Sequence, residues 1–552
     1  MLRNFARSAN SLSRTLNLPI ALPWIAGSSI KRYHTYPDPD DKGVHTSAMA
    51  KELNFEKKIL DKSGEGFVLD PKFKIMETFP GVPNGKKIEA GNAPKTMHTV
   101  LDSGLTVASQ DKPGLMTSLA FMVGSGSSYE VQDGSSRDNT GVTQLLELTA
   151  FKSTSTRGTD DITNQIAQLG GMVQCITTRE NMLYCVDVLR NNLEPALDIL
   201  ADAILRPVYT DDEVNDAKTV ARLMVEEMPS DMLSRDAAQR AAYQGSPLGN
   251  SHFCPIERID KLNAEHLRSF HKEFFVGPNC FITAAGVDHG EFVSLVKERF
   301  ANMPVAKVGE TRKSFQSRRA PSRYTGGLVT SERGLKEPFV KVAVSFEVGG
   351  WSDKDIIPKC VLNQLLGGGS SFSAGGPGKG MYTRLYTQVL SQYTFIESME
   401  AFISLNEHLG MLGIDASCPP EYTPHAIRII VDQLVNLAVE PVLAEELSRA
   451  KNMCKSMMLM QLESRVVLCE DIARQFVTYG HRKTPAEVCA LIDSVTAEDL
   501  QRVADELIDY APSVGCVGHD LSHVPSLKDI NEFLQMYVKE ARKIKQAKMN
   551  TR

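Results

Sequence analysis

The sequence contains no long apolar run and no excess of basic residues. No stretch reaches the roughly 18 apolar residues that a membrane-spanning helix needs, and the closest one, residues 16–27, is interrupted by Pro19 and Pro23. The 552 residues include 61 basic and 67 acidic side chains, a formal charge of −6, so the composition does not indicate a nucleic-acid-binding protein. The hydrophobic share of 42% and the charged share of 23% are typical of a soluble globular protein. The length predicts roughly two to four folded units.

Acidic residues are also missing from the first 37 positions, although residues 1–33 carry five lysines and arginines and several serines. This composition is typical of an organellar transit peptide, which we predict over residues 1–33. A disordered basic tail is the alternative, and a secretory signal is disfavoured because no small-residue cleavage site follows the apolar stretch. Removal of the five positive charges would change the formal charge from −6 to −11. We therefore expect the mature chain to favour basic partners.

None of the ten cysteines forms a CxxC pair, and several lie in or beside apolar runs, as Cys185 and Cys280 do. This pattern indicates buried thiols in a reducing compartment and disfavours a disulfide framework. The mitochondrial matrix would suit both the basic leader and the free thiols.

The chain lacks the zinc-peptidase patterns HExxH and HxxEH. A predicted helix instead places Gln144, Glu147 and Leu148 on one face, where two histidines and a glutamate could bind zinc and activate a water. Glutamine is a poor zinc ligand and leucine is none, so we interpret Glu147 as a structural acid on a half-buried helix. The only histidines four residues apart, His519 and His523, are more simply explained as part of a surface loop than as metal ligands.

Three segments recur along the sequence at offsets of 232 to 234 residues. The pairs are Ile259–Leu267 with Ile492–Leu500, the segments around Pro207 and Pro441, and those ending at Asp288 and Asp520. A nearly constant offset of this size indicates a duplicated domain rather than a short-period solenoid. We therefore predict an α/β protein of the α+β type with two similar halves.

The predicted domain organisation follows from this duplication and from shifts in composition. Within it, strands are predicted over Met172–Thr177 and Met182–Val188, and a helix over Asp212–Glu227, whose start is marked by Thr210 and Asp211. The predicted segments are residues 1–33 (transit peptide), 34–94 (N-terminal arm), 95–305 (first domain), 306–337 (charged inter-domain linker), 338–537 (second domain) and 538–552 (basic tail).

A glycine-rich segment is the strongest local signal, because seven of the fourteen residues from Gly367 to Gly380 are glycine. This glycine content argues against an ordinary strand or helix and leaves backbone groups open to an extended peptide or a phosphate. The phosphate-binding pattern GxxxxGK[ST] is not met, so peptide contact is favoured over nucleotide binding and over a purely structural loop. The candidate substrate-contacting residues are Gly367, Gly368, Gly369, Ser370, Ser371, Phe372, Ser373, Ala374, Gly375, Gly376, Pro377, Gly378, Lys379 and Gly380.

The glycine-rich segment, the helix sequence GVTQLLELTAFKST and the duplicated halves together resemble the pitrilysin-type (M16) metallopeptidase family. The resemblance covers about residues 96–537 and implies two domains, each a mainly antiparallel sheet with packed helices, that form half of a clamshell. In catalytic relatives the helix carries HxxEH, and a glutamate on a later helix is the third zinc ligand. The corresponding positions here are Gln144, Leu148 and Met224, although a small shift would bring in Glu226 or Glu227. Several residues are inserted within 131–139.

The resemblance is strongest to non-catalytic members, and it implies a function. Such a chain is the substrate-recognition subunit of a heterodimeric zinc peptidase that removes N-terminal presequences from imported mitochondrial precursors. The zinc is then expected on the partner, a beta subunit, with no cofactor on this chain. Phe372 and Lys379 are the expected non-glycine contacts to the basic presequence. The expected location is the mitochondrial matrix, or the matrix side of the inner membrane. The alternative is a structural core subunit of the respiratory cytochrome bc1 complex.

Overall fold

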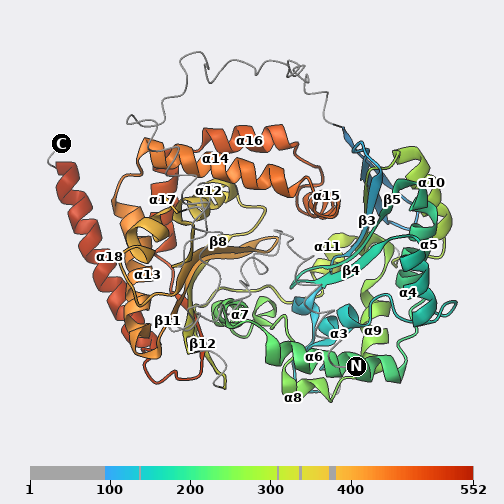
Figure 1. The fold of residues 1–552 in the computed structure, drawn as a ribbon, viewed down its shortest axis with the longest axis horizontal. Coiled ribbons are helices and arrows are strands. Elements are labelled where there is room, and N and C mark those ends of the chain that lie inside the picture. Colours follow the sequence, from blue (N-terminus) through green and yellow to red (C-terminus); the bar gives the residue numbers. More distant parts are fainter. Residues whose placement is uncertain (1–93, 136–137, 308–309, 335–337, 372–380, 551–552) are drawn as a thin grey trace, which may run out of the picture. The chain divides into compact units, whose positions relative to one another are not determined.

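The structure is a computed structural model that describes residues 94–135, 138–307, 310–334, 338–371 and 381–550. These residues are built around two six-stranded sheets with helices packed on them (Figure 1). The predicted transit peptide, the arm up to residue 93 and residues 372–380 of the glycine-rich segment lie outside the described residues. None of the described helices is both long enough and apolar enough to cross a membrane.

The first sheet is mainly antiparallel and has the strand order β1-β2-β6-β3-β5-β4. Only β2 and β6 pair in parallel. The strands are Thr96–Val100 (β1), Thr106–Gln110 (β2), Met116–Val123 (β3), Met172–Thr177 (β4), Met182–Leu189 (β5) and Cys280–Ala285 (β6). Its helices are Val142–Leu148 (α3), Thr159–Gln168 (α4), Leu193–Leu205 (α5), Asp211–Glu227 (α6), Ser230–Ala242 (α7), Ile256–Ile259 (α8), Ala264–Phe274 (α9) and His289–Arg299 (α10).

The second sheet repeats this plan with the order β7-β12-β8-β11-β10-β9, in which only β7 and β12 are parallel. Its strands are Gly327–Glu332 (β7), Val340–Gly349 (β8), Gly368–Ser370 (β9), Ser398–Leu405 (β10), Leu409–Cys418 (β11) and Ser513–Gly518 (β12). After α11 (Arg312–Gln316), the helices are Ile356–Leu366 (α12), Thr423–Val439 (α13), Ala444–Gln461 (α14), Arg465–Tyr479 (α15), Pro485–Ser494 (α16), Ala497–Leu507 (α17) and Leu527–Asn550 (α18).

The two sheets confirm the predicted duplication and the mainly antiparallel fold class. Three elements of the second copy, β12, α14 and α17, begin 233 residues after their counterparts β6, α6 and α9. The local signals recur as well, because Asn263 and Thr496 each cap the helix that follows with a side-chain oxygen. Such caps pair N–H groups that the first turn of a helix would otherwise leave unpaired. We call residues 94–305 the first half and residues 327–550 the second half.

The segment between the halves does more than connect them. Its residues 327–332 form β7, which pairs with β12 at the edge of the second sheet. The range 306–337, predicted as a linker, therefore contains a strand of the second half. Arg333, directly after β7, donates to the carbonyl oxygens of Val225 at 2.8 Å and of Glu226 at 2.6 Å, at the end of α6. A cation at a helix C-terminus is favoured by the helix dipole, so Arg333 stabilises this end of α6.

One helix of each half packs on the sheet of the other half. Helix α15 of the second half packs on β2, β3, β5 and β6, whereas α7 of the first half packs on β7, β8, β11 and β12. Figure 1 shows α15 beside β3 and α7 beside β12. Small residues allow the close approach: a Cβ added to Gly515 in β12 would lie 2.1 Å from the carbonyl oxygen of Ser234 in α7. Each half keeps its own core, and two smaller apolar clusters join the halves where α15 and α7 pack.

The equivalent hairpin turns of the two sheets also meet. Glu180 lies in the β4–β5 turn, and Glu407 lies 227 residues later in the β10–β11 turn. The Glu407 backbone N–H donates to the Glu180 carboxylate at 2.6 Å. Arg319, from the segment between the halves, donates to the same carboxylate, also at 2.6 Å. This contact joins the first half, the connecting segment and the second half at one point.

Candidate functional site

The predicted degenerate metal site lies on α3 and the neighbouring helix α6, which contact each other. Helix α3 begins at a buried carboxylate: Glu130 accepts hydrogen bonds from the backbone N–H groups of Gly141 at 2.7 Å and Thr143 at 3.0 Å. Burial raises the pKa of Glu130 to about 7, although these hydrogen bonds act to lower it. An acidic group is favoured at a helix N-terminus, so Glu130 fixes where α3 begins.

Gln144 occupies the first ligand position and is buried. Its side-chain oxygen accepts a hydrogen bond from the backbone N–H of Cys254 at 2.7 Å. An N–H group buried without a partner would cost about 1–3 kcal/mol. In this chain the position therefore holds a structural hydrogen bond between α3 and the segment before α8.

Glu147, the acid of the motif, is half-buried and faces the end of β4. Its carboxylate accepts hydrogen bonds from the backbone N–H of Thr177 at 2.9 Å and from the Thr177 hydroxyl. Burial raises the pKa of Glu147 from its usual value of 4.5 to about 7, and the two hydrogen bonds only partly oppose this shift. These contacts are consistent with a structural acid that joins α3 to β4.

The raised pKa of Glu147 predicts a pH-dependent stability. The folded state holds a proton on Glu147 more tightly than the unfolded state does. Protonation of Glu147 therefore stabilises the fold fully below pH 4.5, and this stabilisation is lost as the pH rises to about 7. The variant E147Q removes this contribution. We expect the melting temperature of E147Q minus that of wild type to increase as the pH is raised from 5 to 8, measured by differential scanning fluorimetry. The exposed Glu257→Gln serves as the matched control, and a pH-independent difference for E147Q would contradict the assignment.

The remaining predicted ligand positions carry apolar side chains. Leu148 lies at the end of α3, and Met224 is half-buried on α6. Glu226 and Glu227, the alternatives to Met224, are exposed. Throughout the residues that the structure describes, no three His, Cys, Asp or Glu side chains are grouped so as to hold a metal ion. His519 and His523 lie in the loop after β12, where Asp520 accepts hydrogen bonds from Ser522.

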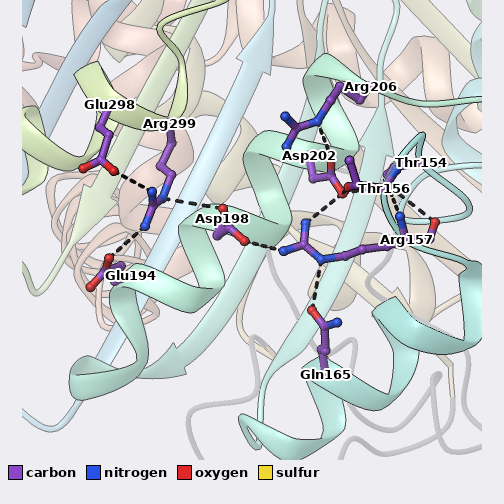
Figure 2. Close-up of polar contacts among 10 residues, drawn as sticks. All are labelled: Thr154, Thr156, Arg157, Gln165, Glu194, Asp198, Asp202, Arg206, Glu298 and Arg299. Carbon is purple, nitrogen blue, oxygen red and sulfur yellow. Dashed lines mark hydrogen bonds and ion pairs between the residues drawn. The ribbon is translucent and has the colours of Figure 1, made fainter.

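The loop that follows α3 is held by an ion-pair network that sequence reasoning missed (Figure 2). Asp202 on α5 is fully buried and accepts from the Thr154 and Thr156 hydroxyls at 2.6 Å each and from Arg157 at 2.7 Å. Arg206 donates to the other oxygen of the same carboxylate at 2.5 Å. Asp202 lies within the mostly apolar sequence LEPALDILADAIL. The hydrophobic pattern of this sequence predicts a helix but does not indicate which threonines and arginines contact Asp202.

The predicted insertion at residues 131–139 precedes α3. Its ends are joined by the backbone N–H of Asn139, which donates to the Val131 carbonyl at 3.1 Å, and by the Val131 N–H, which donates to the Asn139 side chain at 2.6 Å. Asp138 within it pairs with Arg258 at 2.6 Å. The segment is thus closed at its base and attached beside α8.

The first described part of the glycine-rich segment forms a strand. Gly368–Ser370 is β9, an edge strand whose residues pair with Ser398, Met399 and Glu400 of β10. The expectation that glycine excludes a strand is wrong for these three residues. The edge strand needs glycine because Gly368 has φ +111°, and a Cβ there would lie 2.1 Å from the Met399 carbonyl oxygen. Residues 372–380, including Phe372 and Lys379, lie outside the described residues.

Comparison with known protein families identifies the class to which this fold and site belong. Residues 106–256 match the family model described as Insulinase (Peptidase family M16), and residues 261–454 match the Peptidase M16 inactive domain. The two matches agree with two halves of one plan.

Individual relatives show which members of the M16 family this chain is similar to. The chain is 32% identical to the mitochondrial-processing peptidase subunit alpha of Bos taurus over 481 residues, which cover 84% of this chain and 90% of that protein. It is 35% identical to the corresponding subunit of Solanum tuberosum over 433 residues, covering 78% and 83% of the two chains. The chain belongs to the M16 peptidase family, among the mitochondrial-processing peptidase alpha subunits. These relatives give no support to the alternative of a cytochrome bc1 core subunit.

Proposed function

We propose that this chain is the non-catalytic, substrate-recognition subunit of a heterodimeric mitochondrial processing peptidase, which removes N-terminal presequences from imported precursor proteins. The observation that carries the proposal is the combination of alpha-subunit relatives with Gln144, Leu148 and Met224 at the three expected ligand positions. These side chains do not supply the ligands of a zinc ion that could activate a water, so hydrolysis belongs to the partner.

The proposed partner is a beta subunit that carries the zinc ion, and the proposed compartment is the mitochondrial matrix. The proposed substrate is a basic presequence. A mature chain with a formal charge of −11 after loss of the leader would attract such a peptide over distances comparable to the Debye length, about 8–10 Å in physiological salt. This attraction supports recognition of the presequence by this chain.

The division of labour can be tested by reconstitution. We expect the purified mature chain alone to leave a fluorogenic precursor peptide uncleaved. Addition of a beta subunit that carries the zinc motif should restore cleavage, and a chelator should abolish it. Cleavage by this chain alone, with loss of activity on chelation, would show that the chain holds a catalytic metal and would contradict the proposal.

The glycine-rich segment is the proposed substrate contact, and deletion of residues 371–379 tests it. We expect the deletion to raise KM for the precursor at least about tenfold with kcat little changed, because binding energy common to the ground and transition states is lost. Size-exclusion chromatography should show an intact heterodimer. Unchanged KM and kcat would exclude a role of the segment in recognition.

A further inference from the structure

The described residues on either side of the glycine-rich loop, residues 371–382, meet at its base. On the N-terminal side, the Gly367 carbonyl accepts from the Ala401 N–H at 2.8 Å, and the Ser371 N–H donates to the Glu397 carbonyl at 2.8 Å. Together with the pairing of β9 and β10, these bonds fix the N-terminal side of the loop to the edge of the second sheet.

Thr383 on the C-terminal side closes the base. Its hydroxyl oxygen accepts a hydrogen bond from the backbone N–H of Gly368 at 3.1 Å. Thr383 is buried, and its methyl group lies 2.4 Å from the place that a Cβ on Gly367 would occupy. The threonine side chain therefore fits directly against Gly367, which has φ +57° and no side chain to obstruct the approach. The two sides of the loop are thus joined to each other and not only to the sheet.

Arg384, the next residue, attaches this side to a different element. Its buried guanidinium makes two hydrogen bonds to the Glu446 carboxylate of α14, Nε to Oε1 at 2.6 Å and Nη2 to Oε2 at 3.0 Å. A two-point arginine–carboxylate pair fixes orientation as well as distance. The side chains of Tyr382, Arg384 and Glu446 line one cavity of about 500 Å³ between the loop base and the α13–α14 connection.

From this geometry we propose that Thr383 and Arg384 are positioning residues for precursor recognition: they hold the base of the glycine-rich loop closed and in a fixed orientation. The proposal rests on the proposed function, in which the loop contacts the presequence. A loop whose ends are fixed has fewer conformations to lose when it binds a peptide. Loosening the base therefore makes binding weaker, whereas the chemical step on the partner subunit is untouched.

The test compares matched threonine variants in the reconstituted heterodimer. T383V keeps the shape but removes the acceptor for the Gly368 N–H, and we expect it to raise KM about fivefold with unchanged kcat, the effect of about one hydrogen bond. T383S restores the hydroxyl and should return KM to within about twofold of wild type. T163V makes the same chemical change at an exposed position of α4 and should leave both constants unchanged.

Variants of Arg384 provide a second, independent test of the positioning role. R384K retains the charge but cannot reproduce the planar two-point pair with the carboxylate, and we expect it to raise KM with kcat unchanged. The exchange R384E with E446R should recover part of the loss. Melting temperatures of all variants are measured in parallel, because general destabilisation would lower the melting temperature and kcat together.

The outcomes separate this inference from the function on which it rests. If deletion of residues 371–379 raises KM but T383V and R384K behave as wild type, the positioning inference is wrong and the proposed function stands. If the deletion itself has no effect, loop recognition is wrong. A T383S variant as impaired as T383V would also overturn the inference, because it would show that the hydroxyl is not the group that acts.

Discussion

Replacing Asp202 by alanine is expected to lower the free energy of unfolding by about 3–5 kcal/mol, the usual cost of breaking a buried ion pair from one side. The carboxylate is fully buried, and its loss leaves the hydroxyls of Thr154 and Thr156 without their acceptor (Figure 2). It also leaves the buried side of the Arg157 guanidinium facing a cavity. Urea titration of the protein, followed by circular dichroism, measures the change.

The control for D202A is the neighbouring variant D198A. Asp198 pairs with Arg157 and Arg299 but is 35% exposed, so its removal should cost about 1 kcal/mol or less. Equal losses for the two variants would contradict the argument from burial.

The pKa of Asp202 adds a pH test. Burial acts to raise this pKa, but hydrogen bonds from Thr154, Thr156, Arg206 and Arg157 outweigh burial and lower it to about 2. The lowered pKa means that the stabilisation is present above pH 3.8 and is lost as the pH falls towards 2. The difference between wild type and D202A should therefore shrink between pH 5 and pH 3.

Replacing Arg235 by methionine, at the contact between the halves, is expected to lower the free energy of unfolding by an amount comparable to that of D202A. Arg235 lies on α7 and is buried against the Asp415 carboxylate of β11, and it also reaches Glu400 of β10 at 3.2 Å. Burial raises the pKa of Asp415, and Arg235 is the strongest influence that lowers it. Without the arginine, a buried carboxylate is left unpaired, at a cost of about 3–5 kcal/mol.

Two comparisons define the Arg235 result. The loss should be larger at pH 8 than at pH 5, because Asp415 can take up a proton at the lower pH once its partner is gone. The double variant R235M with D415N should recover part of the loss, since the unpaired Asp415 carboxylate is then removed. A loss below about 1 kcal/mol that does not change with pH would contradict the assignment of Arg235 as a buried ion-pair partner.

The elements with local signals could be predicted from the sequence. The start of α6 was expected at Thr210, and the Thr210 hydroxyl does accept from the Glu213 N–H at 3.3 Å. The strands β4 and β5 were expected from their hydrophobic residues and begin where predicted. The duplicated plan was visible because three sequence segments recur at offsets of 232 to 234 residues.

The partners of these elements could not be predicted. The apolar face of α15 shows that the helix is covered, but not that the covering sheet belongs to the first half. The hydrophobic effect is non-directional and does not specify which apolar surface a helix packs against. β7 was missed because its residues, GLVTSE, change from buried to exposed along the strand and lack the alternation of a half-buried strand. The positions of Gln144 and Glu147 followed from helical spacing, whereas their partners Cys254 and Thr177 are distant in sequence and depend on the fold.

The exchange of α7 and α15 makes the chain a covalent analogue of a domain-swapped dimer. If residues 94–305 were made alone, an apolar surface that includes Met122, Leu183 and Phe281, now covered by Val466 and Ile472 of α15, would face water. Such a fragment would be prone to aggregate. Two such halves made as separate chains could cover both sheets only by pairing with each other.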